Sequence, residues 1–572
     1  MEKWDIARAL EEISRYVELS EPNRFKALAF ERAAASLRAV ERPVSDLIAA
    51  GELTATPGIG KATAAVIEEL DRTGQSSYLE ELRARYPPGI FDLLRVAGFG
   101  LKKIALVHEK LGVGNLDELE VAGREGRLAK LPGFGAKTQQ KILDGVEKAR
   151  RRESHFLLPE GVEVADTVLQ QLASIAEVED AEVSGSVRRR LEVIRNVNVV
   201  VKTRKPKAVS AALHKLLESP VDLDADTVKG IALGEIDVYI HLSTPESFAA
   251  TLLRTTGTEE FVNELTSMAG WQWRERSLFV GKKPLVETSE EGLFKTAGLP
   301  FVEPERRETV EDLKRKQKRS LISRSDLRGT FHVHTTFSDG RNSVAEMLSA
   351  AQDAGLEYLG LSDHSPAAHY AGGLSVDRLR EQHREIDAER KSVAPMRVFR
   401  GTEADILPDG SIDYDAKTLA TLDFVIASVH SRFGMSKEEM TDRILKALDN
   451  PFVTFLGHLT GRKLLSRDGY TMDFERVFER AGERGVMIEI NGNSNRLDLD
   501  WRHVRRALDH GVGFSINPDA HSIREYQALV TGSWVARKAG LSAKQIFNTK
   551  PADEVADWLA VRSKAARKAL GV

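Results

Sequence analysis

The chain has 572 residues, 42% of them hydrophobic and 29% charged, with a net charge of −4. This length exceeds what one hydrophobic core supports, so several domains are expected, and the slightly acidic balance excludes a uniformly cationic surface. The sequence has no cysteine, which excludes disulfides, thiol catalysis and cysteine-ligated zinc, so any metal must use His, Asp and Glu.

Hydrophobic periodicity and turn residues divide the chain into successive segments. The N-terminal MEKWDIARALEEI is a charged amphipathic helix rather than a signal peptide, and no apolar run could span a bilayer. We therefore expect a cytoplasmic protein with no membrane partner. The expected segments are two helical domains at 1–85 and 86–150, an α+β domain at 151–244, a small mixed unit at 245–308, a basic linker at 309–327 and an α/β domain at 328–572.

Three Gly-Xaa-Gly turns recur in the helical region, each followed by a helix with lysine in its first turn. This helix-hairpin-helix pattern lets backbone N–H groups approach a phosphate at a helix N-terminus. The sequence therefore predicts binding to the DNA backbone without base specificity. The residues expected to make this contact are Gly58, Gly60 and Lys61, then Gly98, Gly100 and Lys102, and finally Gly133, Gly135 and Lys137.

Seven short β-like runs alternate with helical segments from about residue 328 onward, which predicts a parallel βα barrel. The runs are FHVHT, YLGLSDH, RVFRGTEADI, FVIASVH, TFLGHL, VMIEING and GFSINPDAH. A barrel of this kind gathers the carboxyl ends of its strands around one mouth, where active sites lie.

Polar side chains with metal-binding chemistry lie at or just after these strand ends. Ten of the fourteen histidines follow residue 328. In the HVH and DAH segments, alternate residues of a strand point to the same face. His369, His383, His503 and His510 are expected to be ordinary surface or core residues. The candidate metal ligands are His332, His334, Asp339, His364, Glu403, His430, His458, Asp519 and His521.

These segments, from FHVHTTFSDG to PDAH, together resemble the PHP (polymerase and histidinol phosphatase) domain over residues 328–572. The resemblance implies a (βα)7 barrel holding three divalent metal ions. His332, His334, Glu403 and Asp519 would bind the first, Glu403, His430 and His458 the second, and Asp339, His364 and His521 the third.

Clustered cations activate water and hold phosphate oxygens, which predicts a phosphoesterase with Glu403 and Asp519 as catalytic residues. Mixed imidazole and carboxylate ligands suit manganese, zinc or iron better than magnesium. Arg432 and Arg462 closely follow two of the ligands and are candidate phosphate contacts.

The order of helix-hairpin-helix region, α+β region and barrel resembles the bacterial DNA polymerase X family across essentially the whole chain. The motifs SGSVRRR, RNVNVVV and GEIDVYI carry this resemblance, which makes 86–150 fingers-like, 151–244 a nucleotidyltransferase-like palm and 245–308 thumb-like. Gly185, Ser186 and Arg189 then match the turn that positions a nucleoside triphosphate, and Asp237 matches one of three magnesium-binding aspartates.

Asparagines occupy the other two aspartate positions, Asn196 and Asn198. An amide carries no charge and coordinates weakly, so magnesium is not expected at the palm. Arg190 stands where glycine is usual, and RTTGTEEFVN replaces an aromatic-rich nucleotide-contacting segment. We expect a palm that grips DNA rather than copying it.

The leading hypothesis is a monomeric DNA-binding phosphoesterase that acts in DNA repair on gapped, nicked or 3′-end-containing duplexes, as a 3′-5′ exonuclease or a 3′-phosphate processor. One alternative is a functional DNA-directed polymerase of base excision repair, in which Asp237 and Glu235 or Glu192 support a weak metal site. Another is a small-molecule phosphatase of the histidinol-phosphate type. Whether exonuclease, abasic-site endonuclease or phosphatase activity dominates is left open by the sequence.

Overall fold

The structure is a computed structural model that describes residues 3–20, 24–39, 42, 44–96, 98–232, 236–314 and 320–572. It divides into two compact units, Met1–Ser154 and His155–Val572. None of the described helices has both the length and the apolarity needed to cross a membrane.

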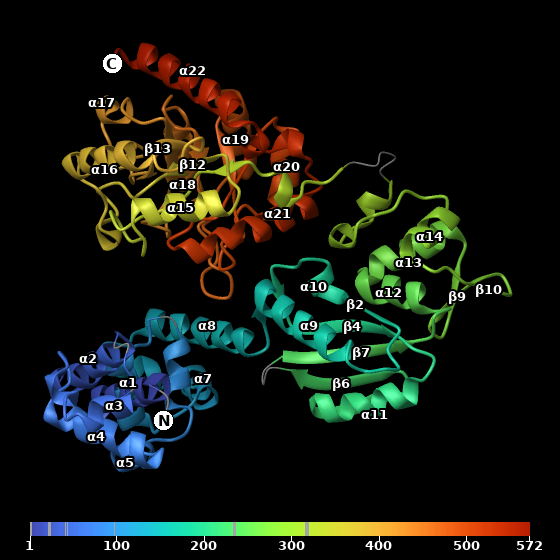
Figure 1. Cartoon of the computed structure of the whole chain (residues 1–572), viewed down its shortest axis with the longest axis horizontal. Coiled ribbons are helices and arrows are strands. Elements are labelled where there is room, and N and C mark those ends of the chain that lie inside the picture. Colours follow the sequence, from blue (N-terminus) through green and yellow to red (C-terminus); the bar gives the residue numbers. More distant parts are fainter. Residues whose placement is uncertain are drawn as a thin grey trace. The chain divides into compact units, whose positions relative to one another are not determined.

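The first unit is built of helices joined by short turns (Figure 1). One hydrophobic core runs from Ile6 in the first helix to Ala149 in the last, so the expected domains 1–85 and 86–150 share a core. Its elements are α1 Lys3–Ser20, α2 Arg24–Ala39, α3 Val44–Ala49, η1 Leu53–Ala55, α4 Lys61–Thr73, α5 Ser77–Ala84, η2 Ile90–Arg95, α6 Leu101–Leu111, α7 Leu116–Arg124, η3 Leu128–Lys130 and α8 Ala136–Glu153.

The second unit begins with an α+β domain around a five-stranded sheet of order β2-β4-β7-β6-β5. β4 and β7 run parallel and alternate buried valine and isoleucine with outward polar residues, which is why α9 packs on one face. The elements are β1 Phe156–Leu157, α9 Leu158–Leu172, β2 Asp180–Ser184, α10 Gly185–Arg188, β3 Val193–Ile194, β4 Asn196–Lys202, α11 Pro206–Leu216, β5 Glu218–Asp224, β6 Thr227–Ala232 and β7 Ile236–Ser243.

A small mixed region follows, with its own core around Phe261 and Phe294. Its elements are α12 Phe248–Thr256, α13 Glu259–Ala269, β8 Gln272–Arg274, β9 Ser277–Val280, β10 Lys283–Leu285, α14 Glu290–Thr296, η4 Pro304–Arg306, η5 Val310–Lys314 and η6 Arg324–Asp326. Part of the expected linker is packed rather than free, because Asp312 is buried and accepts a 2.6 Å hydrogen bond from Arg505 of the barrel. Residues 315–319 of that linker lie outside the described residues.

The C-terminal domain is the parallel βα barrel that the sequence predicts. Its seven strands follow one another in sheet order from β11 to β17. The ring is nearly closed by a parallel bridge between Val333 and Ala520. The elements are β11 Gly329–Thr330, α15 Val344–Asp353, β12 Tyr358–Leu361, η7 His369–Ala371, α16 Val376–Glu389, β13 Arg397–Asp405, α17 Ala416–Leu419, β14 Phe424–Ser428, α18 Lys437–Leu448, β15 Phe455–Leu456, α19 Phe474–Arg484, β16 Met487–Asn491, α20 Trp501–Asp509, β17 Phe514–Asn517, η8 Ile523–Gln527, α21 Ala528–Ala539, η9 Ala543–Gln545, η10 Phe547–Thr549 and α22 Ala552–Leu570.

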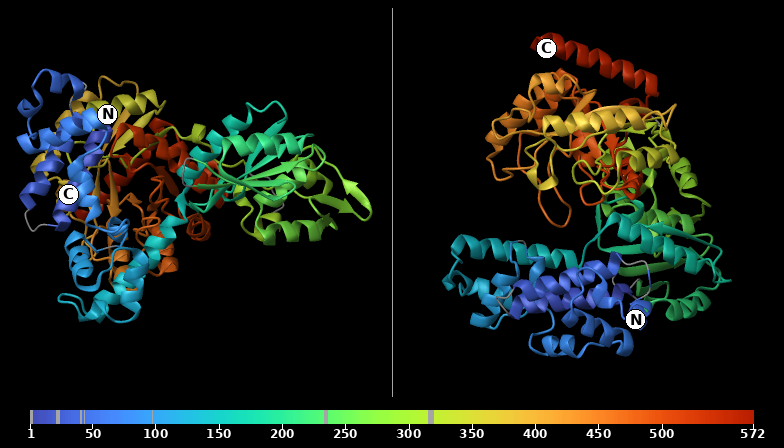
Figure 2. Two further views of the ribbon diagram at one scale, coloured as in Figure 1. Left: turned by 90° about the horizontal axis from the view of Figure 1, so that it is seen from below. Right: turned by 60° about the vertical axis from the view of Figure 1, so that its left-hand side comes forward.

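Aromatic side chains close the barrel at the amino ends of its strands. Phe331, Phe424 and Phe455 form one buried cluster with Phe547 and with Leu559 of α22. The C-terminal helix α22, red in Figure 2, lies along the outside of the barrel over this floor. Water is thereby excluded from the floor, and the opposite end of the barrel is left for polar groups.

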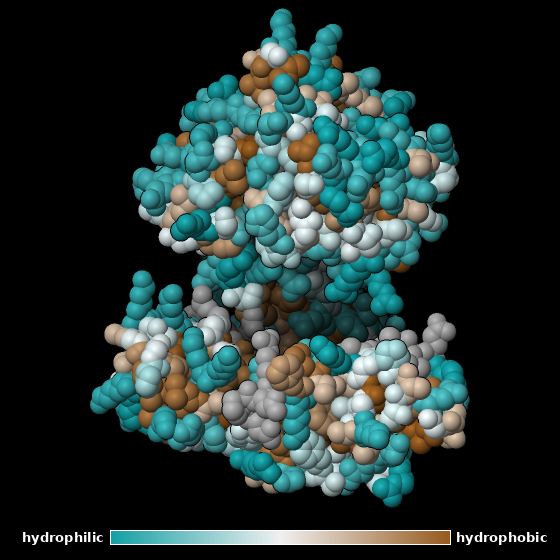
Figure 3. All heavy atoms as spheres, turned by 90° about the vertical axis from the view of Figure 1, so that its left-hand side faces the viewer, coloured by the Kyte–Doolittle hydropathy of each residue, from teal (hydrophilic) through white to brown (hydrophobic). Residues whose placement is uncertain are grey.

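The face of the barrel that is turned to the viewer in Figure 3, the upper body, is covered mainly by hydrophilic residues. Scattered apolar side chains on such a surface are ordinary for a globular domain and need no partner.

Candidate metal centre

All nine predicted ligands converge at the carboxyl ends of the barrel strands. Each belongs to at least one group whose ligand atoms lie within 4.8 Å of one another. The HVH segment follows the two-residue strand β11, which is shorter than expected, but both of its histidines still face one carboxylate. His332 Nε2 and His334 Nε2 each lie 3.4 Å from Asp519 Oδ1.

Glu403, near the end of β13, lies at the centre of the group. Its Oε1 faces His458 Nε2 at 2.9 Å and His430 Nε2 at 3.2 Å. Its Oε2 faces His364 Nδ1 at 3.1 Å, His332 Nε2 at 3.3 Å and His334 Nε2 at 3.6 Å. The two oxygens of one buried carboxylate therefore face two different sets of imidazoles, so Glu403 could help to hold more than one cation.

Asp339 forms the third point of convergence. Its Oδ1 lies 3.4 Å from His521 Nε2 and 3.6 Å from His364 Nε2. Asp363, which is buried beside this loop, accepts a 2.8 Å hydrogen bond from the backbone N–H of Thr335. The loop that carries Asp339 is therefore fixed by an internal carboxylate rather than by solvent.

Two ligands occupy the left-handed region of the backbone map, Asp519 at φ 54° and His458 at φ 23°. Such conformations cost free energy in residues other than glycine and are concentrated at functional sites. Hydrogen bonds at the barrel mouth hold them: the N–H of His458 donates to Glu489 at 3.0 Å, and Asp519 accepts from Asn491 at 3.1 Å.

The histidines of the group differ in protonation according to their neighbours. Burial alone would lower the pKa of His332, but the carboxylates of Glu489, Glu403 and Asp519 outweigh it and raise the pKa well above its usual value. Burial and the adjacent imidazoles of His521 and His364 lower the pKa of His334 to about 3. Neutral His334 has a free lone pair for a cation.

The carboxylates are held ionised despite their burial. Desolvation opposes ionisation of Glu403 and Asp519, yet neighbouring imidazoles, His332 foremost, hold both pKa values well below the usual range. The result is a buried site with anionic oxygens and imidazole nitrogens facing each other.

The donor set fits divalent cations. Within the described part of the chain, several buried ligand atoms have no hydrogen-bond partner: Nε2 of His332, both ring nitrogens of His334, Nδ1 of His364, Nδ1 of His458 and Oε1 of Glu403. Unsatisfied buried polar atoms are costly and rare, so their concentration at one cavity indicates partners that a cation supplies.

Two supporting carboxylates were not predicted from the sequence. Glu489 Oε2 lies 2.6 Å from His332 Nδ1, and Asp405 contacts His430 Nδ1. Asn491 and Asn517 donate hydrogen bonds of 2.8 and 3.0 Å to Glu489. Carboxylates behind metal-binding histidines fix the ring orientation and the tautomer. The available signal was a charged residue inside each apolar strand.

The cations at the cavity differ from the predicted ones. A cavity of about 530 Å³ contains seven of the nine ligands, and among the described residues lining it the cations are Arg341, Lys463 and Arg496. Arg496 Nε lies 3.2 Å from Asp519 Oδ2. Arg462 does not line this cavity; it bonds Asp500 at 2.9 Å and backbone carbonyls, and Arg432 does not line it either.

The three hairpin loops of the first unit share one backbone geometry. The first glycine of each has positive φ, 90° at Gly58, 74° at Gly98 and 80° at Gly133. The second glycine of each, Gly60, Gly100 or Gly135, is the N-cap of α4, α6 or α8. Each loop therefore ends at a helix N-terminus, and a lysine lies in the first turn of that helix, as predicted: Lys61, Lys102 and Lys137. Ala97, just before the second loop, lies outside the described residues.

The palm positions lie together as the family pattern requires, because Asn196 on β4 pairs with Asp237 on β7. The side chains of Asn196, Asn198 and Asp237, however, already have partners within the palm. Asn198 donates to Asn196 at 2.7 Å, His241 lies 2.9 Å from Asn198 Oδ1, and Lys229 pairs with Asp237 at 2.9 Å.

The arginines of the SGSVRRR turn have partners within the protein. Arg189 donates to Glu308 at 2.8 Å and to the Thr256 carbonyl at 2.7 Å. Arg190 adopts φ 55°, the backbone region where glycine is usual, and stacks 4.0 Å above Trp534 of α21. Ser186 and Gly185 lie in the short helix α10 beside β4.

Of the two alternative carboxylates for a weak palm metal site, the structure describes only Glu192. Glu192 is buried and lies 3.7 Å from Arg462 and 3.6 Å from Arg502 of the barrel. Glu235 lies outside the described residues.

Comparisons with known proteins match each part of this architecture. A helix-hairpin-helix domain family matches residues 1–76, a SAM-like helix-hairpin-helix tandem matches residues 90–148, and the PHP domain family matches residues 330–493. The chain is 34% identical to a Bacillus subtilis protein named "DNA polymerase/3'-5' exonuclease PolX". The match covers 98% of this chain and 99% of that protein.

The barrel alone is similar to smaller curated proteins. A "Probable phosphatase" of Thermoanaerobacter sp. is 28% identical over 38% of this chain and 89% of its own length. A "Probable phosphatase" of Photobacterium profundum is 31% identical over 41% of this chain and 94% of its own length.

Proposed function

Because the chain belongs to the bacterial DNA polymerase X family with a C-terminal PHP domain, we propose that it is a DNA-binding, metal-dependent phosphoesterase that processes DNA 3′ ends. The relative's name couples a polymerase with a 3′-5′ exonuclease, and we assign only the hydrolytic half to this chain. Gapped, nicked or 3′-end-containing duplexes are the proposed substrates.

The observation that carries this proposal is the position of Glu403. Its Oε1 faces two imidazoles and its Oε2 faces three, that of His364 included, and Asp339 lies at a further point of convergence. We assign three cations to this cluster, with His332, His334, Glu403 and Asp519 at the first, Glu403, His430 and His458 at the second, and Asp339, His364 and His521 at the third. The ligand atoms form four overlapping groups, in which Glu403 lies once with His332 and His458 and once with His364 and His430. The imidazole and carboxylate donors favour manganese, zinc or iron.

The chain's own residues perform three tasks in the reaction. Glu403 and Asp519 supply the negative charge that keeps cations in a buried cavity, and Glu489 fixes the ring of His332 from behind. Arg496 and Lys463 line the same cavity and are proposed to contact the phosphate. Bound cations supply an activated water and neutralise charge that develops on the phosphodiester.

We propose that the palm no longer copies DNA. Nucleotidyl transfer needs anionic oxygens for two magnesium ions, whereas Asn196 and Asn198 are neutral and Asp237 is paired with Lys229. Arg189, which would meet a triphosphate, is bonded to Glu308. The palm is proposed to grip DNA instead, and it packs on the barrel through contacts such as Glu192 with Arg462 and the Arg189 carbonyl with Lys538.

The helix-hairpin-helix loops are proposed to hold the duplex. Helix N-termini with glycine approaches bind phosphate, and this contact carries no sequence information. Backbone binding of this kind lets the barrel act on ends of any sequence.

Digestion of labelled gapped, nicked and 3′-phosphate duplexes in the presence of manganese tests the proposal. We expect shortening or dephosphorylation from the 3′ end that chelator abolishes. Products formed without added metal from metal-free protein would overturn it.

A second function is favoured by one observation: the barrel matches phosphatases over nearly their entire length. A small phosphomonoester would then be the main substrate. Comparison of kcat/KM on a 3′-phosphorylated duplex and on histidinol phosphate separates the two, because only the first substrate gains from the hairpin loops.

A further inference from the structure

A cavity of about 380 Å³ lies where the palm, η4 and η6 meet helix α21 of the barrel. Its volume is within the range of about 300–1,000 Å³ that is usual for small-molecule sites. In the described chain, the charged residues of its lining are four arginines, Arg188, Arg190, Arg324 and Arg537, and one carboxylate, Glu305. We call it the arginine cavity.

Two of these arginines are already paired with carboxylates. Arg188 lies 2.8 Å from Glu290 and 3.1 Å from Glu182. Arg537 donates a 2.5 Å hydrogen bond to Glu305, so the one carboxylate of the lining is used as well. Arg188 and Arg537 therefore belong to the fixed wall of the cavity.

Arg190 and Arg324 form no ion pair with a carboxylate of the described residues. The guanidinium of Arg190 stacks on the ring of Trp534 at 4.0 Å, which occupies its face and leaves its N–H edge. Arg324 contacts only the carbonyls of Leu327 and Ala354, at 3.4 and 3.3 Å. Burial lowers the pKa of both side chains, and no carboxylate opposes this shift for Arg324. The four arginines less the two paired ones leave two uncompensated positive charges at the cavity.

The backbone of Arg190 is strained at this place. Its φ is 55°, in the left-handed region, which costs free energy for any residue with a side chain and is concentrated at functional sites. Arg190 stands where glycine is usual in the family, and glycine would avoid that cost. The strained position therefore carries one of the two uncompensated guanidinium groups of the cavity.

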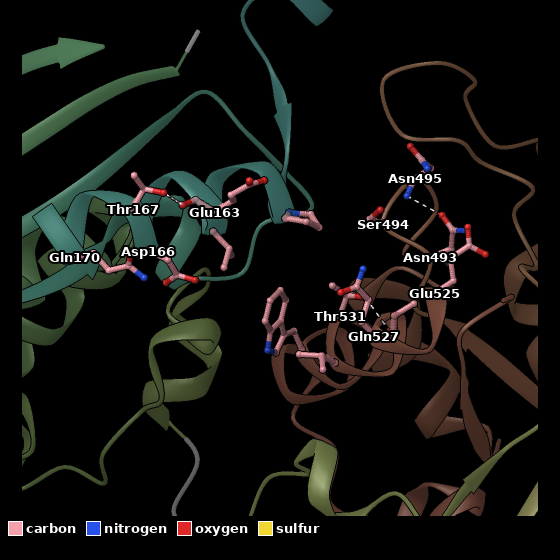
Figure 4. Close-up of a pocket in the computed structure, with 15 residues that line it drawn as sticks. Glu163, Asp166, Thr167, Gln170, Asn493, Ser494, Asn495, Glu525, Gln527 and Thr531 are labelled. Atoms are coloured by element: carbon pink, nitrogen blue, oxygen red, sulfur yellow. Dashed lines mark hydrogen bonds between the residues drawn. The ribbon is translucent and has the colours of Figure 1, made fainter. Parts of the chain in front are cut away.

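The arginine cavity is separate from the metal centre. A cavity of about 670 Å³ lies between them and shares lining residues with each. The charged residues of this middle cavity, within the described chain, are all carboxylates: Glu163 and Asp166 on α9, and Glu525 across from them (Figure 4). These groups repel the phosphates of any strand that would cross from one site to the other. The arginine cavity therefore takes a ligand of its own.

We propose that the arginine cavity binds a small phosphomonoester. Such a phosphate carries a charge of about −1.5 to −2 at pH 7 and three acceptor oxygens, which matches the two uncompensated guanidinium groups. Pro304 and Val530 line the same cavity and give the organic part of the ligand an apolar surface. Binding there needs neither hydrolysis nor metal ions, so the proposal goes beyond the proposed function and does not depend on it.

A ligand in this cavity connects two parts of the second unit. Arg190 follows the SGSVRRR helix of the palm, whereas Arg324 precedes the first strand of the barrel. One phosphate that contacts both side chains therefore stabilises the packing of the palm on the barrel. Because the ligand binds the folded chain, it should raise the temperature of thermal unfolding as its concentration increases.

Isothermal titration of the metal-free full-length protein with thymidine 5′-monophosphate tests the cavity. We expect binding of the monophosphate and none of thymidine, which lacks the phosphate. Arg190→Gly and Arg324→Gln should each weaken binding by at least about tenfold, because each removes charge-assisted hydrogen bonds. The charge-matched control is Arg384→Gln, an exposed position on α16 that is absent from the lining, and it should bind as the unaltered protein does.

Arg190→Gly should fold normally, because glycine adopts a φ of 55° without strain. Thermal unfolding without ligand checks this for both variants. The monophosphate should raise the unfolding temperature of the unaltered protein and of Arg384→Gln, and should raise it less in the two cavity variants. If Arg190→Gly does not fold, Arg324→Gln alone decides between the outcomes.

Undetectable binding of the monophosphate, or equal affinity in the unaltered protein and in Arg324→Gln, would overturn the proposal. Equal binding of thymidine would overturn it as well, because the phosphate would then not be recognised. Displacement of the monophosphate by a 5′-phosphorylated oligothymidylate would assign the cavity to a DNA end rather than to a small molecule. None of these outcomes changes the proposed function, which the digestion with manganese tests separately.

Discussion

Glu489 Oε2 lies 2.6 Å from Nδ1 of His332, and both side chains are fully buried. Because Nδ1 faces this carboxylate, Nε2 of the same ring points to Glu403 and Asp519 at 3.3 and 3.4 Å. One interaction between residues far apart in the sequence therefore sets the direction of a metal ligand.

Glu489→Gln should weaken manganese binding by roughly 10- to 100-fold, since the amide orients the imidazole less strongly and makes it a poorer donor. Isothermal titration with manganese measures this, and excess manganese should recover much of the hydrolysis. The matched control is Glu479→Gln, an exposed position on α19. Unchanged affinity would mean that Glu489 only fills the core.

Glu403→Ala should lower hydrolysis of DNA 3′ ends by at least about 100-fold, because loss of one carboxylate unpairs two of the proposed cations. Metal content measured by mass spectrometry should fall in the same variant, which separates loss of metal from loss of substrate binding. Glu479→Ala provides the control. Retained hydrolysis would place the chemistry outside the barrel.

The isolated first unit should bind duplex DNA without sequence preference, with an affinity that falls steeply as salt rises. Replacing Lys61, Lys102 and Lys137 together by alanine should flatten the salt dependence, by about 0.9 in log–log slope for each phosphate that the protein no longer neutralises. Fluorescence anisotropy of labelled duplex DNA measures the affinity at each salt concentration.

A charge-matched control removes three cations that already pair with neighbouring glutamates: Arg85, Lys110 and Arg124. This control should bind nearly as well as the unaltered unit. If both triple variants lose binding equally, net charge rather than the hairpin loops binds the DNA.

The full chain should fail to extend a primer on gapped DNA, with magnesium or with manganese. The double change Asn196→Asp and Asn198→Asp should recover little activity. A carboxylate at 198 would lie beside His241, Asp237 would still pair with Lys229, and Arg189 would still bond Glu308. Template-dependent extension by the unaltered chain that disappears in Asp237→Ala would refute the loss of polymerase activity.

The contact between Asn198 and His241 also leads to a prediction about the pH dependence of stability. Burial lowers the pKa of His241 to about 4, so the imidazole is neutral at pH 7. Its folded pKa lies below its unfolded value of about 6.5, so its contribution to stability is complete above that pH and is lost as pH falls toward 4. Asn198→Asp should raise the pKa of His241, because the new carboxylate favours the charged ring.

An NMR titration of the His241 ring in both proteins measures the shift. The stability of Asn198→Asp should also decline less between pH 6.5 and 4, relative to its own value at pH 7, than that of the unaltered chain. A pKa that does not move would mean that residue 198 and His241 do not interact in solution.

The sequence by itself determined the parts that depend on local pattern. Alternation within HVH and DAH predicted that the two outer residues of each segment share a face, although both segments lie just after β11 and β17 rather than within them, and the order of strands and helices predicted the barrel. Repeated Gly-Xaa-Gly turns predicted the geometry of the hairpin loops, because a positive φ followed by an N-cap is a property of a few consecutive residues.

Only the tertiary structure decided which distant groups meet. His332 and Glu489 are 157 positions apart, and no local period relates them. Arg462 closely follows a metal ligand in the sequence, yet it bonds Asp500, whereas Arg496 lines the cavity. Side-chain direction at a loop depends on the carboxylates and carbonyls that packing brings within hydrogen-bond reach, and packing is a property of the whole domain.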